Sequence, residues 1–235
     1  MGERLLKVGG VTAFTATDYP GQLAAVVFVQ GCPWRCGYCH NPHLQERPAV
    51  GALHWPAVLE KLGRRVGLID GVVFSGGEPT MDPALAGAMA EVKALGFKVG
   101  LHTACIYPKQ LAAVLPLVDW VGFDIKAPFD RYARITGVAD SGAQARACAQ
   151  AIVASGVEYE CRTTIHPSLL REDEVLELAD TLAGMGVDNY ALQIFRPQGC
   201  NDSALNAVAT AGYPSGAALA HISARFARFT LRKNG

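Results

Sequence analysis

Short apolar runs rich in β-branched residues alternate with longer segments of helical periodicity along almost the whole chain. The apolar runs span residues 23–30, 71–75, 97–103, 118–126, 157–164 and 189–195. The helical segments span residues 55–66, 83–95, 109–115, 142–155, 172–185 and 215–232. A strand, a helix and a second strand in succession form the βαβ unit of a parallel sheet. The pattern therefore predicts an α/β fold whose six parallel strands form a partial (β/α)6 barrel of the TIM type.

The composition fits one soluble domain. The chain has 235 residues, half of them hydrophobic, which is enough for a single core over residues 1–235 with an irregular stretch near 196–214. Lys plus Arg and Asp plus Glu both number 21, without a basic stripe, so nucleic acid is not an expected partner. We find no signal peptide and no apolar run of membrane-spanning length, and we expect a cytoplasmic protein without membrane contact.

Polar or glycine-rich residues follow the ends of successive predicted strands. They are Gly76, Gly77, Glu78 and Pro79 after the second strand, His102 and Thr103 on the third, Asp124 and Lys126 on the fourth, Arg162 on the fifth and Gln193 on the sixth. Ligands of parallel α/β folds bind at this edge of the sheet. We therefore expect one site built from several loops.

Three cysteines, Cys32, Cys36 and Cys39, lie within eight residues of the loop 31–43. A four-iron cluster usually takes four thiolates, so a cluster bound here keeps one iron open for a ligand. The alternative is a zinc ion completed by His40 or His43. The other four cysteines are scattered singly, which argues against a secreted disulfide framework.

The cysteine spacing and the motifs around it resemble the radical S-adenosylmethionine (radical SAM) superfamily. The segments 14–21, 25–32 and 38–42 resemble the activating proteins of glycyl radical enzymes, and the matches at 74–80, 124–128 and 162–166 extend this resemblance. Within that group the chain is most similar to anaerobic ribonucleoside-triphosphate reductase activating proteins, with pyruvate formate-lyase activating enzyme as a near relative.

The resemblance implies a radical SAM activase. Cys32, Cys36 and Cys39 would bind three irons of one [4Fe-4S] cluster, and the fourth iron would bind S-adenosylmethionine. Reductive cleavage would yield a 5'-deoxyadenosyl radical that takes hydrogen from a glycine of the partner enzyme. Because the chain has no second group of clustered cysteines, it would need an external one-electron donor such as flavodoxin.

The resemblance also assigns cofactor-binding roles. Gly76, Gly77, Glu78 and Pro79 would form the turn whose carbonyls receive the methionine ammonium, although such a turn is also common as a plain loop. Lys126 would neutralise the methionine carboxylate and Asp124 would bind the ribose or a cation. The alternative for these two residues is a purely structural role as an ion pair.

Tyr38 and His40 would contact the nucleoside, and either residue is equally compatible with a role in capping the loop backbone. Arg162 and Gln193 are further candidates, and Gln193 falls where pyruvate formate-lyase activating enzyme has a histidine. His102, followed by Thr103, stands where relatives have an aspartate that helps bind a monovalent cation. A neutral imidazole cannot supply that charge, so either the cation site is altered or His102 contacts the substrate.

Two other functions remain open from the sequence. One is a radical enzyme for a small molecule, such as a deazaguanine synthase. The other is a non-enzymatic iron–sulfur or zinc module. The segment 18–21, Asp-Tyr-Pro-Gly, favours a protein substrate.

Overall fold

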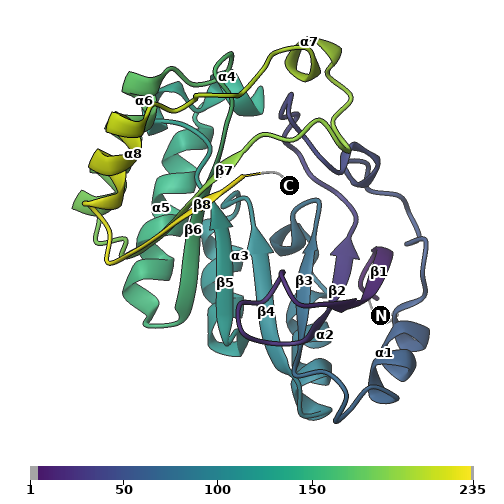
Figure 1. Cartoon of the computed structure of the whole chain (residues 1–235). Coiled ribbons are helices and arrows are strands. Elements are labelled where there is room, and N and C mark those ends of the chain that lie inside the picture. The colour runs from purple at the N-terminus through teal and green to yellow at the C-terminus, as the bar shows by residue number, and fades with distance from the viewer. Residues whose placement is uncertain (1–4, 234–235) are drawn as a thin grey trace.

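One mixed sheet organises the protein, for which a computed structural model describes residues 5–233. Its strands follow the chain in order from one edge to the other. Over the described residues they are β1 (Val8–Thr15), β2 (Ala24–Val29), β3 (Gly71–Gly76), β4 (Lys98–Thr103), β5 (Trp120–Asp124), β6 (Glu158–Ile165), β7 (Asn189–Ile194) and β8 (Arg228–Arg232). β1 pairs with β2 in the antiparallel sense, and β2 to β8 are parallel (Figure 1).

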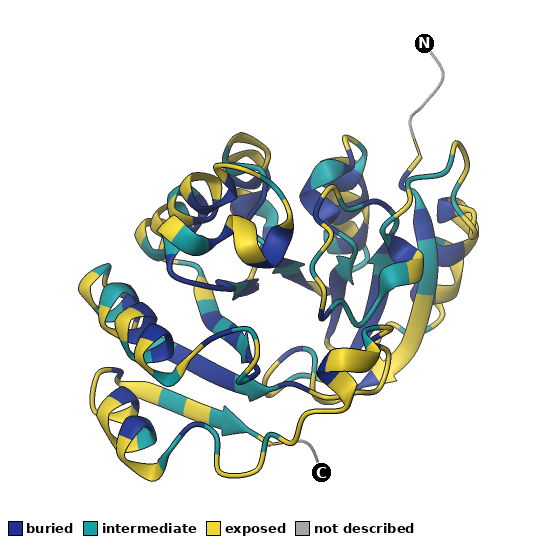
Figure 2. Cartoon of the chain, turned by 90° about the horizontal axis from the view of Figure 1, so that it is seen from above, coloured by how far each residue is buried: buried dark blue, intermediate teal, exposed yellow. Residues whose placement is uncertain are grey.

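Helices connect the parallel strands, and the longer ones lie on the convex side of the curved sheet (Figure 2). They are α1 (Trp55–Gly63), α2 (Leu85–Ala94), α3 (Pro108–Val114), α4 (Ala133–Thr136), α5 (Ser141–Ser155), α6 (Glu172–Gly184), α7 (Ser203–Asn206) and α8 (Gly216–Ser223). Among the residues described, no helix is long and apolar enough to span a membrane.

The predicted partial barrel of parallel strands is confirmed, with one more parallel strand than the six expected. The six predicted strands correspond to β2–β7. The prediction of a helix over 215–232 is wrong beyond Ser223, because the chain turns there and 228–232 pairs with β7. The antiparallel β1 was also not predicted. The segment 196–214 is largely irregular and contains only the single turn of α7.

A small apolar cluster, called the plug below, fills the inside of the barrel. It is separate from the main core, which lies beneath the helices. It consists of Tyr19, Ala24, Val26, Val73 and Trp120. The segment 16–22 crosses the concave side of the sheet (Figure 1), and its Tyr19 ring stacks on Trp120 at 5.3 Å between centroids. A Cβ on Gly71 or Gly100 would lie 3.3 Å from the Tyr19 ring, so small residues make room for this plug. The barrel interior above the plug stays open.

Candidate functional site

A cavity of about 600 Å³ lies at the carboxyl ends of the parallel strands. The predicted site residues that line it are Cys32, Cys36, Tyr38, Cys39, His40, Gly76, Gly77, His102, Thr103, Asp124, Lys126, Arg162 and Gln193. Glu78 and Pro79 are the two predicted residues outside the lining. The fold thus brings together loops that are far apart in the sequence.

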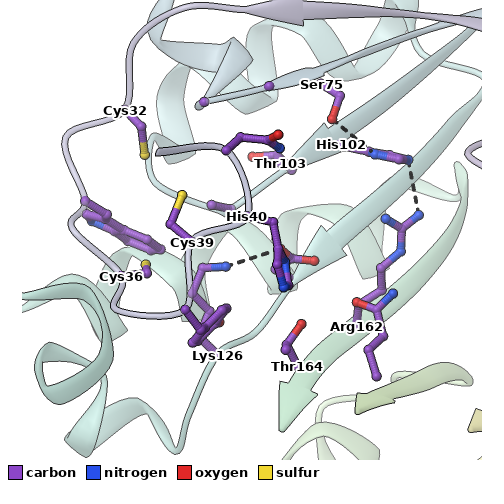
Figure 3. A pocket seen from close by; sticks show the side chains of 18 of the residues that line it. Cys32, Cys36, Cys39, His40, Ser75, His102, Thr103, Lys126, Arg162 and Thr164 are labelled. Carbon is purple, nitrogen blue, oxygen red and sulfur yellow. Dashed lines mark hydrogen bonds and ion pairs between the residues drawn. The ribbon is translucent and has the colours of Figure 1, made fainter. Parts of the chain in front are cut away.

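The cysteine loop is held by backbone hydrogen bonds on both sides. The N–H of Gly31 donates to the Leu44 carbonyl at 2.8 Å, and the N–H of Cys32 donates to the Gln45 carbonyl at 2.9 Å. The Arg35 guanidinium donates to the Cys32 carbonyl at 2.6 Å. The three thiols are free and half-buried, and they gather at one side of the pocket (Figure 3).

The thiols suit a polynuclear cluster better than a single metal ion. Burial raises the pKa of Cys32 to about 12 and also raises the pKa of Cys36, so both thiols stay protonated until a metal displaces the protons. No three His, Cys, Asp or Glu side chains in residues 5–233 are grouped closely enough to bind one ion. In a cluster each thiolate binds a different iron. The donor set therefore fits a [4Fe-4S] cluster and does not fit zinc completed by His40 or His43.

The other cysteines lie outside the cavity. Cys105, Cys148 and Cys161 are fully buried in the main core. Cys200 packs against the cysteine loop, where its thiol donates to the Gly37 carbonyl at 3.5 Å, but it is not part of the lining. The lining therefore offers three cysteine ligands.

Gly76 and Gly77 allow the strand end to press against the cysteine loop. Gly76 has a φ of +117°, and a Cβ there would lie 2.5 Å from the backbone of Val29. A Cβ on Gly77 would lie 2.3 Å from the Gly31 carbonyl oxygen and 2.9 Å from that of Leu44. Only glycine fits at these two positions. The glycine pair thus sets how closely the loop approaches the sheet.

Glu78 points into the protein rather than into the cavity. Its buried carboxylate accepts hydrogen bonds from the N–H of Thr80 at 3.1 Å, the N–H of Ala104 at 2.7 Å and the hydroxyls of Thr80 and Thr103. Burial raises its pKa, and these four donors oppose the shift. Pro79 is also buried and opens a short 3₁₀ turn. The Glu78 and Pro79 side chains thus support the turn, and the expected contact through the carbonyls of the turn stays a prediction.

Asp124 and Lys126 form a partly buried ion pair, with Nζ and Oδ2 3.2 Å apart; the Lys126 side chain is 8% exposed and the Asp124 side chain 39%. Burial alone would raise the pKa of Asp124, but Lys126 and Arg162 outweigh it and hold the pKa below its usual value. Lys126 Nζ also lies 5.4 Å from the centroid of the Tyr38 ring. Both residues of the pair line the cavity, so the ion pair leaves them in reach of a ligand, and their contact with one stays a prediction.

His102 is neutral and held in place by several groups. Burial and the nearby Arg162 lower its pKa to about 3. Nδ1 is 3.3 Å from the Ser75 hydroxyl, and Nε2 is 2.9 Å from the Asp18 carbonyl and 3.2 Å from an Arg162 nitrogen (Figure 3). Nε2 donates to Asp18 or accepts from Arg162, depending on which nitrogen carries the proton. His102 therefore brings no negative charge to the cavity.

Arg162 shares a buried carboxylate with a residue that the sequence did not reveal. Glu160 binds Nε of Arg162 at 2.9 Å through one oxygen and Nη2 of Arg232 at 2.8 Å through the other. The register places Arg232 on β8 beside Gln193 on β7. Arg232 also lines the cavity. The last strand thus contributes to the site.

His40 is fixed at the mouth of the cysteine loop. Its Nε2 is 3.1 Å from the Arg196 carbonyl, and its ring stacks on Phe195 at 5.9 Å. Burial lowers its pKa, so the ring is neutral at pH 7. His40 therefore lines the cavity while it is held by the Arg196 carbonyl, and its contact with the nucleoside stays a prediction.

The lining also includes residues that sequence reasoning missed. Examples are Thr17, Asp18, Phe28, Ser75, Thr164, Arg196 and Arg232. Thr164 is two residues from Arg162 on β6, so strand alternation would have found it. Ser75 directly precedes Gly76 at the end of β3. Thr17 and Asp18 lie in the segment 14–21, which the sequence marked as a family resemblance and not as part of the site. No local signal marked Arg232, because its strand was taken for a helix.

Comparisons with known proteins agree on one superfamily. The family model described as the Radical SAM superfamily matches residues 26–183. MJ1227 of Methanocaldococcus jannaschii, named as a glycyl-radical enzyme activating enzyme, is 29% identical over 83% of this chain and 82% of its own length. The pyruvate formate-lyase-activating enzyme of Clostridium pasteurianum is 30% identical over 83% of this chain and 84% of its own.

A solved structure shares the fold. SuiB of Streptococcus suis, crystallised with S-adenosylmethionine, superposes with a TM-score of 0.64 at 15% identity. The match covers 88% of this chain and 48% of SuiB, so the chain spans about half the length of that protein.

Proposed function

The chain belongs to the radical SAM superfamily and to its glycyl-radical enzyme activating enzymes, and from this premise we propose that it activates a partner enzyme by abstracting hydrogen from a glycine. Its cofactors are one [4Fe-4S] cluster and S-adenosylmethionine. When bound, they supply the reductive cleavage that yields methionine and a 5'-deoxyadenosyl radical. The protein binds, orients and shields these groups. We place this activity in the cytoplasm, in one domain.

The cavity that joins the three cysteines to the strand ends carries the proposal. Cys32, Cys36 and Cys39 bind three irons. Carbonyls of the turn at Gly76 and Gly77 accept from the methionine ammonium. Glu78 and Pro79 hold that turn in shape.

The remaining contacts fall to polar residues around the cavity. Lys126 neutralises the methionine carboxylate, while Asp124 keeps Lys126 in place and accepts from the ribose. Tyr38, His40 and Gln193 border the nucleoside. Thr103 fixes the strand end through Glu78. His102 and Arg162 face the cavity as neutral and cationic groups, which argues against a monovalent cation bound through residue 102.

The proposed partner is an anaerobic ribonucleoside-triphosphate reductase, and the proposed electron donor is flavodoxin. The resemblance of the chain to the activating proteins of this reductase supports this partner. The donor is inferred because the sequence has only one cysteine-rich loop.

Two measurements test the proposal. Anaerobically reconstituted protein, given S-adenosylmethionine and dithionite, is expected to form 5'-deoxyadenosine, and a Cys36→Ala variant is expected to lose this activity. Incubation with each candidate partner then shows by electron paramagnetic resonance which one acquires a glycyl radical. A signal only in pyruvate formate-lyase would reassign the partner. No product from a fully loaded cluster would overturn the enzyme assignment.

A further inference from the structure

The two halves of the cysteine loop are held by different parts of the protein. In the first half, the N–H of Cys32 donates to the Gln45 carbonyl at 2.9 Å, within the loop's own return to the sheet. The second half, residues 37–40, carries Cys39 and contacts the segment 196–206. This segment, called the strap below, leaves the end of β7, passes the cysteine loop and ends with α7 (Figure 1).

Two polar contacts join the strap to the loop, one on each side of Cys39 in the sequence. The Cys200 thiol donates to the Gly37 carbonyl at 3.5 Å. On the other side, Nε2 of the His40 ring is 3.1 Å from the Arg196 carbonyl. Because a carbonyl only accepts, Nε2 carries the proton of this neutral ring and donates it to the strap.

The strap also packs on the loop through backbone atoms. Gly199 has a φ of +86°, and a Cβ there would lie 2.7 Å from the His40 carbonyl oxygen. A side chain at this position would push the strap and the loop apart. Gly199 thus sets the distance between the two segments.

Hydrogen bonds within the strap give it a defined shape. The N–H of Asp202 donates to the Cys200 sulfur at 3.4 Å, and the Asn206 side chain donates to the Cys200 carbonyl at 3.1 Å. The Asp202 carboxylate caps α7 by accepting from the N–H groups of Ala204 and Leu205. Leu205 is buried in the main core. The strap is therefore anchored in the protein at one end and contacts the cysteine loop at the other.

We propose that Gly199 and Cys200 are positioning residues for the cluster, an inference that rests on the proposed function. They hold residues 37–40 and thereby set the place of Cys39 relative to the other two cysteines of the loop. Three thiolates that bind three irons of one cluster have to lie at fixed distances from one another. A shift of Cys39 therefore weakens the binding of the cluster.

Gly199→Ala and Gly212→Ala form a matched pair. Both glycines are exposed and have positive φ angles, +86° and +77°, so alanine introduces similar backbone strain in the two variants. A Cβ at residue 212 meets nothing within 4 Å, whereas one at residue 199 meets the His40 carbonyl.

The readout is the rate at which the anaerobically reconstituted proteins lose their cluster to EDTA, followed by the absorbance of the cluster. We expect a rate about tenfold higher in Gly199→Ala than in the wild type, as overpacking against backbone atoms predicts. Gly212→Ala is expected to keep the wild-type rate.

Two substitutions of Cys200 test the polar contact. Cys200→Ala removes the donor to the Gly37 carbonyl and the acceptor of the Asp202 N–H, and we expect cluster loss about threefold faster than in the wild type. Cys200→Ser keeps a donor and an acceptor at this place, so it is expected to stay close to the wild-type rate. This pair decides the question should Gly199→Ala fail to fold.

The reduction potential of the cluster is a readout that a purely structural role would not change. Displacement of the strap brings water to Cys39, and water stabilises the negative charge that the cluster gains on reduction. We therefore expect the potential to rise in Gly199→Ala and Cys200→Ala and to stay unchanged in Gly212→Ala.

The inference is overturned if Gly199→Ala and Cys200→Ala keep the wild-type rate and potential, or if Gly212→Ala loses its cluster as fast as Gly199→Ala. It is also overturned if Cys200→Ala and Cys200→Ser both take up no iron, because Cys200 would then be a ligand of the cluster. Failure of the proposed function looks different, because the wild type itself would then bind no four-iron cluster or would not cleave S-adenosylmethionine.

Discussion

Gly77→Ala offers the sharpest test of how the sheet positions the cysteine loop. The added Cβ would lie 2.3 Å from the Gly31 carbonyl oxygen and 2.9 Å from that of Leu44. Non-bonded carbon contacts settle at about 3.5 Å, so the loop has to withdraw by about 1 Å. Both obstacles are backbone atoms, which cannot rotate away as a side chain would. Overpacking of this kind costs about 1–3 kcal/mol.

Urea unfolding of the cluster-free protein measures this cost, and iron and sulfide analysis after reconstitution measures whether the loop still binds the cluster. Gly87→Ala is the control, because Gly87 lies inside α2 and a Cβ there meets nothing within 4 Å. That variant is expected to gain about 0.5–1 kcal/mol from the higher helix propensity of alanine. A Gly77→Ala protein with unchanged stability and a full iron load would refute this account of the glycine.

Two further predictions concern buried titratable groups. Glu78→Gln leaves some of the four donors of Thr80, Thr103 and Ala104 without an acceptor, and we expect the free energy of unfolding in urea to fall by about 2–3 kcal/mol. The control Glu60→Gln, on the exposed face of α1, is expected to change this free energy little. Equal losses in the two variants would contradict the role of Glu78. His102 has a pKa of about 3 in the folded protein and about 6.5 in the unfolded chain. Between these two pH values the unfolded chain binds a proton on His102 that the folded protein does not bind. The free energy of unfolding therefore falls by up to about 1.4 kcal/mol per pH unit as the pH drops. A His102→Gln variant is expected to show a shallower decline in cluster-free protein, and an unchanged slope would rule out His102 as a source of acid sensitivity.

The sequence was sufficient for the parts of the fold whose signals are local. The six expected strands correspond to β2–β7, and the helices α1, α2, α3, α5 and α6 begin and end close to the expected residues. β1 was missed because Gly9 and Gly10 break its pattern and residues 11–14 are exposed on both faces, so no alternation of apolar and polar residues marks it. β8 was missed because its alternation covers only five residues directly after a true helix.

The residues of the candidate site also divide into those with a local sequence signal and those without one. Cysteine spacing and glycine turns are visible in a single stretch of sequence, and these residues do line the cavity. The direction of a side chain is set by contacts that are distant in the chain. Glu78 turns inward because Thr103 and Ala104, about 25 residues later, supply its donors. Its neighbours in the sequence carry no sign of this contact.

The positions of the missed residues bear on what distinguishes this enzyme from others of its superfamily. The matched region, residues 26–183, contains the cysteines, the glycine turn and the pair Asp124 and Lys126. Asp18, Arg196 and Arg232 all line the same cavity from outside that region. The fold thus wraps segments from both ends of the chain around the same cavity as the cysteines and the glycine turn. The cavity therefore depends on side chains from the segment before β2 and from the chain after α6 as well as on the cysteine loop.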